Sequence, residues 1–395
     1  MDDVPAGPAS PEPRRPSLSV VIPVHNGGRD LECCLRRLRD SDTGPIDYEL
    51  IVVDDGSTDG SAERAASFGA RVVRHDRPRG PAMARNTGAL AATAPLIFFL
   101  DADVAVHREA LGRVVARFEA DPELTALFGS YDDAPTAPGL VSQFRNLLHH
   151  FVHQEGQFVA DARPARTFWT GCGAIRRQVF LDFGGFDPRL YRRPAIEDIE
   201  LGYRLTRAGC RILLVRNILA THLKRWTLRG VIRTDIFRRG VPWMILMKRS
   251  GVAEADLNVK RGQRVCVAAA GLVGLALLAS PLFPWLLLAV PAGLATQVGL
   301  NAAFYLFLAR RRGWGFAVGS IPLHYLYYCC CGVSVLIALT LWHLSNRRTS
   351  VTATEPDPLA VPEVAAPAGV RADPAEPVAI ASRPNIPRAG RPSPW

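Results

Sequence analysis

The sequence predicts an α/β protein in which a mostly parallel sheet, covered by helices, is followed by transmembrane helices. Short β-rich runs alternate with helical patterns from residue 18 to residue 130, and this alternation is typical of βαβ units. Polar clusters stand directly after three of these runs, where parallel sheets bind their ligands. Residues 265–344 are almost entirely apolar, which indicates membrane spans.

Composition narrows the class of protein. The chain has 395 residues, which excludes a disulfide-stapled mini-protein, and its net charge is +10. Much of the excess positive charge lies between Lys224 and Arg264 and in the loop from Arg310 to Arg312. This position beside the apolar block favours a membrane face, and no nucleic-acid-binding motif is visible, so we expect no nucleic-acid partner. The eight cysteines form no C-x-x-C pair, which favours a reduced compartment without a zinc site.

The expected elements follow in order along residues 17–224, which we take as one catalytic domain. Residues 1–15 carry four prolines and no apolar core, so we expect residues 1–16 to be disordered and not to form a signal peptide. The β-rich runs are residues 18–24, 49–53, 71–74, 96–100 and 124–130. The helical patterns are residues 31–38, 61–68, 80–92 and 109–120.

About three membrane spans are expected within residues 264–345. Of the apolar runs 265–281, 283–309 and 316–344, the first is slightly shorter than the about 20 residues that a span needs, and the others are longer. A re-entrant hairpin in place of the first two spans is the alternative. Basic residues before the first run and after the second predict a multi-pass protein of the cell membrane with a cytoplasmic catalytic domain.

Two further segments complete the organisation. Residues 225–263 interleave arginines with Trp, Leu, Val and Ile, which fits either an in-plane interfacial helix or an ordinary surface helix. Residues 346–395 are rich in Pro, Ala and Val without periodicity, so we expect a disordered tail.

Acidic side chains follow two of the predicted strands. Asp54 and Asp55 come directly after the second β-rich run, and Asp101 and Asp103 follow the fourth. Two carboxylates on one strand-end turn can face a divalent cation, although such acids also serve as turn caps. The nearby Arg85 and a tight glycine turn make a nucleoside diphosphate with its metal the better interpretation.

Four motifs in series resemble glycosyltransferase family 2, the inverting enzymes of GT-A fold. They are Val20-Val21-Ile22-Pro23-Val24-His25-Asn26, Val53-Asp54-Asp55-Gly56-Ser57-Thr58-Asp59-Gly60, Ala84-Arg85-Asn86-Thr87-Gly88 and Leu100-Asp101-Ala102-Asp103. The resemblance covers residues 18–216 and implies a Rossmann-like nucleotide-diphospho-sugar transferase domain. It implies donor binding by Pro23, His25, Asn26, Asp54, Asp55, Arg85, Asn86, Asp101 and Ala102. It also implies that Asp103 binds Mg²⁺ or Mn²⁺, with Asp55 near the nucleobase.

Glu197 and Asp198 resemble the acidic pair of the same family. The resemblance implies that Asp198 is the general base and that Glu197 positions the acceptor or the base. From the residues alone, both acids equally suit the first turn of a helix. Glu200 is assigned to the acceptor side, where we expect it to form a supporting pair with Arg204.

The segment around Trp169 is a candidate acceptor site. Gly171 and Gly173 allow close backbone approach, and Trp169 is suited either to stacking on a sugar or to the core.

The histidines complete the predicted site. The resemblance to GT-A enzymes makes His222 the candidate third ligand of the metal, although a lone histidine is more often a packing residue. His149, His150 and His153 share helical spacing and are expected to be structural or on the acceptor side, without binding metal.

These observations predict a membrane-anchored inverting glycosyltransferase. We expect it to move a sugar from a nucleotide sugar, with UDP as the expected nucleotide, to a lipid-linked or membrane-delivered glycan acceptor. A processive polysaccharide synthase subunit is one alternative, but residues 239–243 depart from the Q-x-x-R-W signature of such synthases. A sugar nucleotidyltransferase and a catalytically inactive membrane partner are the others.

Overall fold

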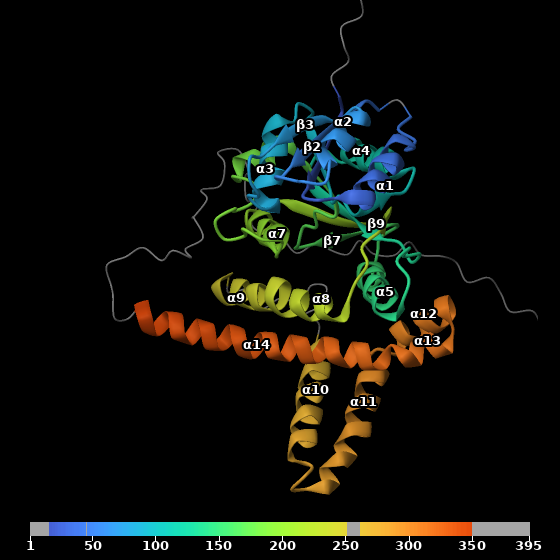
Figure 1. The fold of residues 1–395 in the computed structure, drawn as a ribbon, viewed down its shortest axis with the longest axis vertical. Helices are drawn as coiled ribbons and strands as arrows, with labels where there is room; N and C mark the ends of the chain where they lie inside the picture. The colour runs from blue at the N-terminus through green and yellow to red at the C-terminus, as the bar shows by residue number, and fades with distance from the viewer. Residues whose placement is uncertain (1–15, 45, 251–260, 350–395) are drawn as a thin grey trace, which may run out of the picture.

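The computed structural model describes residues 16–44, 46–250 and 261–349. The expected disordered segments, residues 1–15 and 350–395, lie outside the described residues, as do residues 251–260 of the expected linker. Figure 1 shows a sheet domain, a layer of helices beneath it, and a helical hairpin that projects away from both.

One mixed sheet of nine strands forms the upper domain. Its order is β3-β2-β1-β4-β8-β6-β9-β5, with β7 paired to β9. The neighbours β3, β2, β1 and β4 are all parallel, whereas β8 runs antiparallel between β4 and β6. The strands are β1 Leu18–Val24, β2 Tyr48–Asp54, β3 Arg71–Arg74, β4 Leu96–Leu100, β5 Val104–Val106, β6 Leu124–Tyr131, β7 Ala162–Ala165, β8 Cys172–Arg176 and β9 Arg211–His222. The α/β fold with a mostly parallel sheet is thus confirmed.

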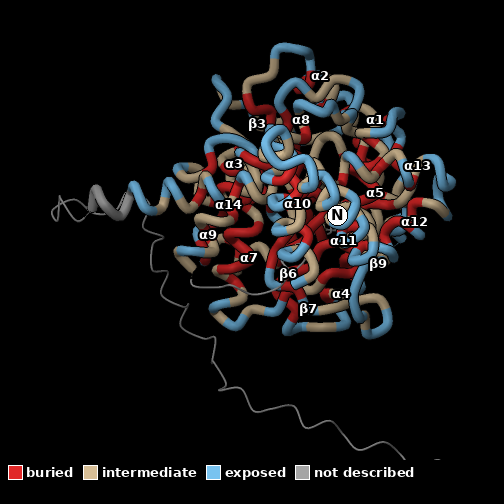
Figure 2. The backbone as a smooth tube through the Cα atoms, turned by 90° about the horizontal axis from the view of Figure 1, so that it is seen from below, coloured by how far each residue is buried: buried red, intermediate tan, exposed pale blue. Residues whose placement is uncertain are grey.

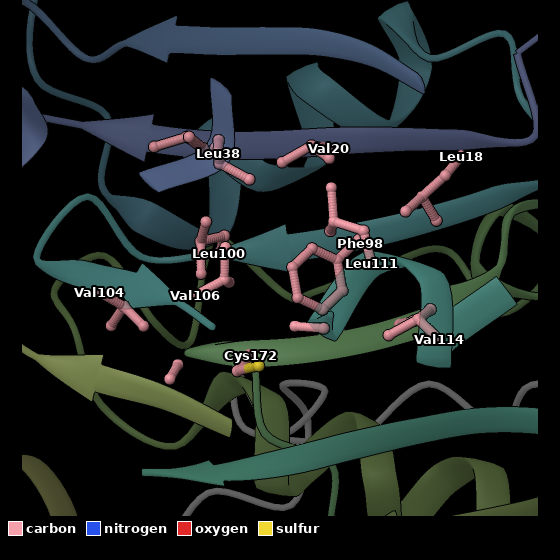
Figure 3. Packing of buried hydrophobic residues seen from close by; sticks show 14 of the residues in the cluster. Leu18, Val20, Leu38, Phe98, Leu100, Val104, Val106, Leu111, Val114 and Cys172 are labelled. Atoms are coloured by element: carbon pink, nitrogen blue, oxygen red, sulfur yellow. The ribbon is translucent and has the colours of Figure 1, made fainter. Parts of the chain in front are cut away.

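Helices cover both faces of this sheet and enclose two apolar cores. They are α1 Gly28–Arg39, α2 Ser61–Ser67, α3 Pro81–Ala91, α4 Ala110–Ala120, α6 Arg177–Asp182 and α7 Glu197–Arg207. On one face, α1 and α4 bury side chains such as Leu38 and Leu111 in one apolar cluster with Phe98, and Figure 3 shows members of this cluster. On the other face, α3, α6 and α7 pack around Phe99 and Phe128. The helical spacing of leucines in α1 puts one stripe of the helix into the core.

The layer beneath the sheet domain consists of helices from three parts of the chain. They are α5 Leu140–Gln154, α8 Leu228–Arg233, the π-helix η1 Thr234–Gly240, α9 Val241–Ser250, α12 Ala302–Arg312, α13 Trp314–Gly319 and α14 Ile321–Thr349. Helix α10 Arg261–Ala279 and helix α11 Ala289–Leu300, joined through the 3₁₀ turn η3 Pro284–Leu288, form the projecting hairpin. In Figure 1, α14 runs across the base of this hairpin and beneath α8 and α9.

The segment expected as an in-plane or surface helix is enclosed between two layers. Trp243 and Leu246 of α9 belong to the core of the sheet domain, and Trp243 Nε1 donates a hydrogen bond to Tyr203 Oη at 3.0 Å. Ile236 of η1 packs instead on α14. A Cβ atom at Gly240 would lie 2.2 Å from Ser334 Oγ, so glycine is needed where η1 meets α14.

The part of the chain that the structure describes has two helices that are long and apolar enough to cross a membrane, whereas three spans are expected from the sequence. Among the described residues, Arg261–Ala279 and Trp314–Leu344 are long and apolar enough to cross a membrane. A third candidate, Pro284–Leu300 with Ala302–Arg312, is bent by 76° at its break. The hairpin carries strongly exposed leucines, including Leu278 and Leu282, as the exposed stretches in Figure 2 also indicate.

A buried polar residue accounts for the break in the second expected span. Asn301 ends α11 and precedes α12, and its Nδ2 donates to the carbonyl oxygen of Gln297 at 2.8 Å. Its Oδ1 lies 3.0 Å from the Tyr328 hydroxyl and 3.3 Å from Gln263 Nε2. Polar groups in apolar surroundings must find partners inside the protein, so this network joins α10, α14 and the bend.

Candidate active site

The predicted donor residues converge because β1, β2 and β4 are parallel neighbours whose carboxyl ends meet at one edge. The half-buried Pro23 lies within the end of β1, and His25 follows that strand. Asp54 ends β2 and is only 3% exposed, and Asp101 follows β4. The register pairs Val24 with Asp54, which places these strand ends side by side.

Asp55 organises the loop that leads from β3 to α3. Its Oδ1 accepts hydrogen bonds from His75 Nδ1 at 2.7 Å and from the Arg79 amide at 2.8 Å. Its Oδ2 accepts from the Gly80 amide at 2.8 Å. Gly80 has φ +93°, and a Cβ there would lie 2.3 Å from the Arg192 carbonyl oxygen. Asp55 therefore shapes a wall of the site, and its contact with a nucleobase stays a prediction.

His25 and Asn26 tie the end of β1 to the loop after β2. His25 Nδ1 donates to the carbonyl oxygen of Asp55 at 2.8 Å. Asn26 has φ +54°, and its Oδ1 accepts from the Thr58 amide at 2.9 Å. The Asn26 amide donates to Ser57 Oγ at 2.9 Å. This bonding holds the two motifs in one rigid loop pair.

Arg85 connects the end of β4 to the start of α7. Its Nη2 donates to Asp101 Oδ1 at 2.6 Å, and its Nη1 donates to Glu197 Oε1 at 2.8 Å. Glu197 Oε2 accepts from the Ala195 amide at 3.0 Å. Both Arg85 and Glu197 are buried, so the bridge is shielded from water. The neighbouring Ala102 packs against the core of the sheet.

Asp198 is held with its carboxylate partly accessible at the start of α7. Its Oδ2 accepts from the Thr170 amide at 3.2 Å, and its Oδ1 accepts from the Ile199 amide at 2.8 Å. Burial and the adjacent charge of Glu197 raise the pKa of Asp198 to about 6, against the opposing charge of Arg85. A carboxylate with such a pKa is suited to accept a proton near neutral pH.

Asp103 and His222 form the second half of the site. His222 Nε2 and Lys224 Nζ each lie 3.7 Å from Asp103 Oδ2. Burial alone would raise the pKa of Asp103, but interactions with His222 and Lys224 lower it to about 2. His222 Nδ1 donates to Asn146 Oδ1 at 2.7 Å, and the ring stacks on Tyr131 with centroids 4.4 Å apart.

This donor set fits a divalent cation such as Mg²⁺ or Mn²⁺. Asn146 Oδ1 accepts the hydrogen bond of His222 Nδ1, so the neutral ring would turn its Nε2 lone pair toward Asp103, and the two side chains could bind one cation. No cluster of three or more His, Cys, Asp and Glu ligands occurs in the part of the chain that the structure describes. Such cations bind through one or two protein ligands when substrate phosphates and water supply the rest, so two are sufficient.

The predicted acceptor segment surrounds a single tryptophan. The Trp169 ring packs edge-on against Tyr131 and His149, with centroids 4.7 and 5.1 Å apart. A Cβ at Gly171 would lie 2.4 Å from the Trp169 ring, and one at Gly173 would lie 2.2 Å from the Trp169 carbonyl oxygen. Trp169 is half-buried and contacts both apolar cores, so it closes one side of the site while keeping an accessible surface.

Glu200 and Asn86, predicted for the acceptor and the donor, make contacts that hold the backbone near the site. Glu200 is buried and pairs with Arg204 Nε at 2.7 Å, and Arg204 also donates to backbone oxygens of the loop before α7. Asn86 donates from Nδ2 to the Phe186 carbonyl oxygen at 2.7 Å and accepts from the Phe186 amide at 3.0 Å. The structure therefore places both residues where they hold backbone in position.

Sequence reasoning did not find three residues of the site. His75 bonds Asp55, Asn146 orients His222, and Tyr131 lies between His222 and Trp169. His75 and Tyr131 stand at the carboxyl ends of β3 and β6, a position that the rule for parallel strand ends can identify. Asn146 lies within α5, and nothing in the local sequence indicates its contact with a residue 76 positions away.

Comparison with known proteins identifies the family of this chain. The family described as Glycosyl transferase family 2 matches residues 19–184. The pre-mycofactocin glycosyltransferase of Mycobacterium tuberculosis is 32% identical over 250 residues, covering 61% of this chain and 50% of that protein. Validoxylamine A glucosyltransferase of Streptomyces hygroscopicus subsp. limoneus is 32% identical, covering 49% of each chain. The chain thus spans about half the length of these curated relatives.

Two further similarities address family and fold. An uncharacterized glycosyltransferase of Mycobacterium bovis is 35% identical over 203 residues, which make up 50% of this chain and 82% of that protein. A mannosyltransferase of Pyrobaculum calidifontis, solved in complex with GDP-Man and Mn²⁺, shares the fold with a TM-score of 0.50 and 18% identity. That similarity covers 82% of this chain and 88% of the solved chain. With its four motifs converging at one edge of the sheet, the chain belongs to glycosyltransferase family 2.

Proposed function

We propose that this protein transfers a sugar from a nucleoside-diphosphate sugar, with a UDP donor, to a lipid-linked or membrane-delivered acceptor. One observation carries the proposal: Arg85 joins Asp101 at the end of β4 to Glu197 at the start of α7. Asp103 follows Asp101 by two positions and Asp198 directly follows Glu197, so the bridge supports a shared site for the candidate metal ligand and the candidate base. The solved mannosyltransferase of the same fold holds GDP-Man, which supports a nucleotide-sugar donor here.

The reaction follows from the placement of these groups. Asp198, ionised above pH 6, accepts the proton of the acceptor hydroxyl, and the acceptor oxygen attacks the anomeric carbon. The bond from that carbon to the diphosphate breaks, its electron pair goes to the departing oxygen, and the configuration inverts. Lys224 lies where it can stabilise the negative charge that develops on the diphosphate. A divalent cation held by Asp103 and His222 would supply Lewis-acid neutralisation of the same charge.

The helical part of the chain supports the proposal of a membrane-associated acceptor. The hairpin α10–α11 exposes leucines such as Leu278, and α14 lies between this hairpin and the sheet domain. A cell-membrane protein with its catalytic domain on the cytoplasmic side fits the arginines at the end of α12, which lie beside the sheet domain. Arg311 pairs there with Asp133 at 2.5 Å, so this basic loop and the domain share one side.

The proposal is tested with native membranes that carry the parent chain or Asp198→Asn. Radiolabelled UDP-sugars and other nucleotide sugars are supplied, and label in the lipid and glycan fractions is counted. We expect transfer by the parent and a loss of about 10²- to 10⁴-fold in Asp198→Asn, because a general base contributes about that factor. Asp103→Asn serves as the second variant, and it should weaken donor binding, whereas Asp198→Asn should retain it. Equal transfer by the parent and Asp198→Asn would remove the assigned base.

A further inference from the structure

A cavity of about 640 Å³ lies where the sheet domain, the helical layer and the start of the projecting hairpin meet. Its walls come from α5, η1, α9, α10 and α14, so residues from three distant parts of the chain enclose it. Its volume falls in the range of sites for small organic ligands. None of the residues predicted for the donor or the metal lines it.

Basic side chains outnumber acidic ones in the lining of this cavity. Arg145, Arg239, Lys248 and Arg264 line it, and Asp235 is the one acid among its lining residues. Arg145 is ion-paired with Asp235. Arg239 is half-buried and makes no hydrogen bond or ion pair with the residues that the structure describes. The excess of basic over acidic groups suits a phosphate or diphosphate, which accepts charge-assisted hydrogen bonds from guanidinium groups.

Apolar side chains from four helices also line the cavity. Leu148, Met244, Met247, Val267 and Val335 contribute to it. Methionine side chains are flexible and adapt to irregular apolar ligands. Val267 belongs to α10, whose exposed surface beyond this point is apolar over several turns. An apolar chain can therefore enter from the hairpin side while its charged end meets Arg239.

The cavity also reaches toward the candidate base. His149 and His153 line it, and the Trp169 ring packs on both, with centroids 5.1 and 5.2 Å apart. The residue after Trp169 is Thr170, whose amide holds Asp198. Burial lowers the pKa of His153 to about 3 and that of His149 well below its ordinary value, so both rings are neutral in this passage. A neutral passage lined by rings suits the uncharged part of a glycolipid head group.

We propose that this cavity anchors the acceptor as a lipid-phosphate-linked sugar: Arg239 binds the phosphate, the methionines bind the first part of the chain, and the sugar extends past Trp169 to Asp198. This inference rests on the proposed function, because it supplies the acceptor for the same base. The phosphate remains attached to its lipid and takes no part in bond making.

The test measures binding of a short lipid phosphate to the full chain in a nonionic detergent. Farnesyl phosphate is titrated by calorimetry, with farnesol as the chain without phosphate and inorganic phosphate as the phosphate without a chain. We expect farnesyl phosphate to bind at least about ten-fold more tightly than either. Arg239→Gln should weaken it about ten-fold, since one charge-assisted hydrogen bond is lost. The matched control is Arg238→Gln, an adjacent arginine that does not line the cavity and should leave the affinity unchanged.

Two further arms make the result decisive. Lys248→Gln changes an exposed residue at the rim, so it should fold normally and also weaken binding. Equal affinity of the parent and both variants, or equally tight binding of dimyristoylphosphatidylglycerol, would overturn the proposal. Metal-dependent hydrolysis of the nucleotide sugar is measured on the same samples. If the protein hydrolyses the nucleotide sugar but does not bind farnesyl phosphate, only the proposed role of the cavity as the acceptor site is overturned. If it binds farnesyl phosphate but neither hydrolyses the nucleotide sugar nor transfers its sugar, only the proposed function is overturned.

Discussion

The raised pKa of Asp198 makes the pH dependence of the reaction a sensitive test. With a pKa of about 6, Asp198 is about one-tenth ionised at pH 5 and almost fully ionised at pH 8. A base is active only when ionised, so the rate should fall about ten-fold from pH 8 to pH 5. The structure names the causes of the shift, which are burial first and then the charge of Glu197.

Glu197→Gln should therefore move the acid limb of the pH profile to lower pH. The substitution removes the negative charge beside Asp198, and it also frees Arg85 from Glu197, so its positive charge acts more strongly on the base. Both effects lower the pKa of Asp198 toward the ordinary value of about 3.9. Burial, the largest cause of the shift, remains in this variant, so the ten-fold fall between pH 8 and pH 5 should become smaller without disappearing.

The assay is the initial rate of sugar transfer by membranes between pH 5 and pH 8, expressed as kcat/KM for the acceptor. Glu109→Gln is the control, because Glu109 is an exposed acid directly before α4 and is not among the groups that shift the pKa of Asp198. This variant should show the same acid limb of the pH profile as the parent. An unshifted limb in Glu197→Gln, or a parent rate that does not change between pH 5 and pH 8, would refute the assignment of Asp198 as the titrating base.

Two further changes probe the metal half of the site and the helical layer. Asn146→Ala removes the hydrogen bond that orients His222, so the Mn²⁺ concentration for half-maximal transfer should rise about ten-fold. Saturating Mn²⁺ should restore the rate. An unchanged Mn²⁺ titration would contradict the role of Asn146. Gly240→Ala forces a Cβ to within 2.2 Å of Ser334 Oγ and should lower the free energy of unfolding by about 1–3 kcal/mol, seen as a lower Tm. Gly271→Ala, with open space around its Cβ, should leave the Tm unchanged or higher, and equal Tm values for both variants would argue against the packing of η1 on α14.

The strands that carry the site were the easiest part of the fold to predict. The bounds of β1 and β4 agree with the runs of apolar residues, because strands buried on both faces need apolar side chains throughout. The bounds of β3 also agree with the prediction, although β3 is a partly exposed strand at the edge of the sheet. The short β5 and the proline-containing β7 and glycine-containing β8 were not predicted as strands. Their pairing is antiparallel with strands distant in sequence, and three to five residues carry too little periodicity to identify.

In the apolar region, composition predicts which segments are helical and apolar but not the direction in which each helix runs. Hydropathy identified the correct stretches, but Asn301 bends the second one by 76°, and α14 runs across the hairpin. Composition measures the transfer of a segment into lipid, whereas the direction of a helix depends on what it packs against. For α14, those contacts include η1 at Gly240 and α10 at Tyr328.

The sequence by itself determined the family, the mostly parallel sheet and the edge at which the acids gather, because strand order along the chain and buried apolar runs are local properties. Only the tertiary structure decided that Arg85 bonds both Asp101 and Glu197, that Asn146 orients His222, and that Arg239 lines a cavity near Trp169. These contacts join residues from about 16 to more than 100 positions apart. Their distances are set by how helices and strands pack, and no local pattern encodes that packing.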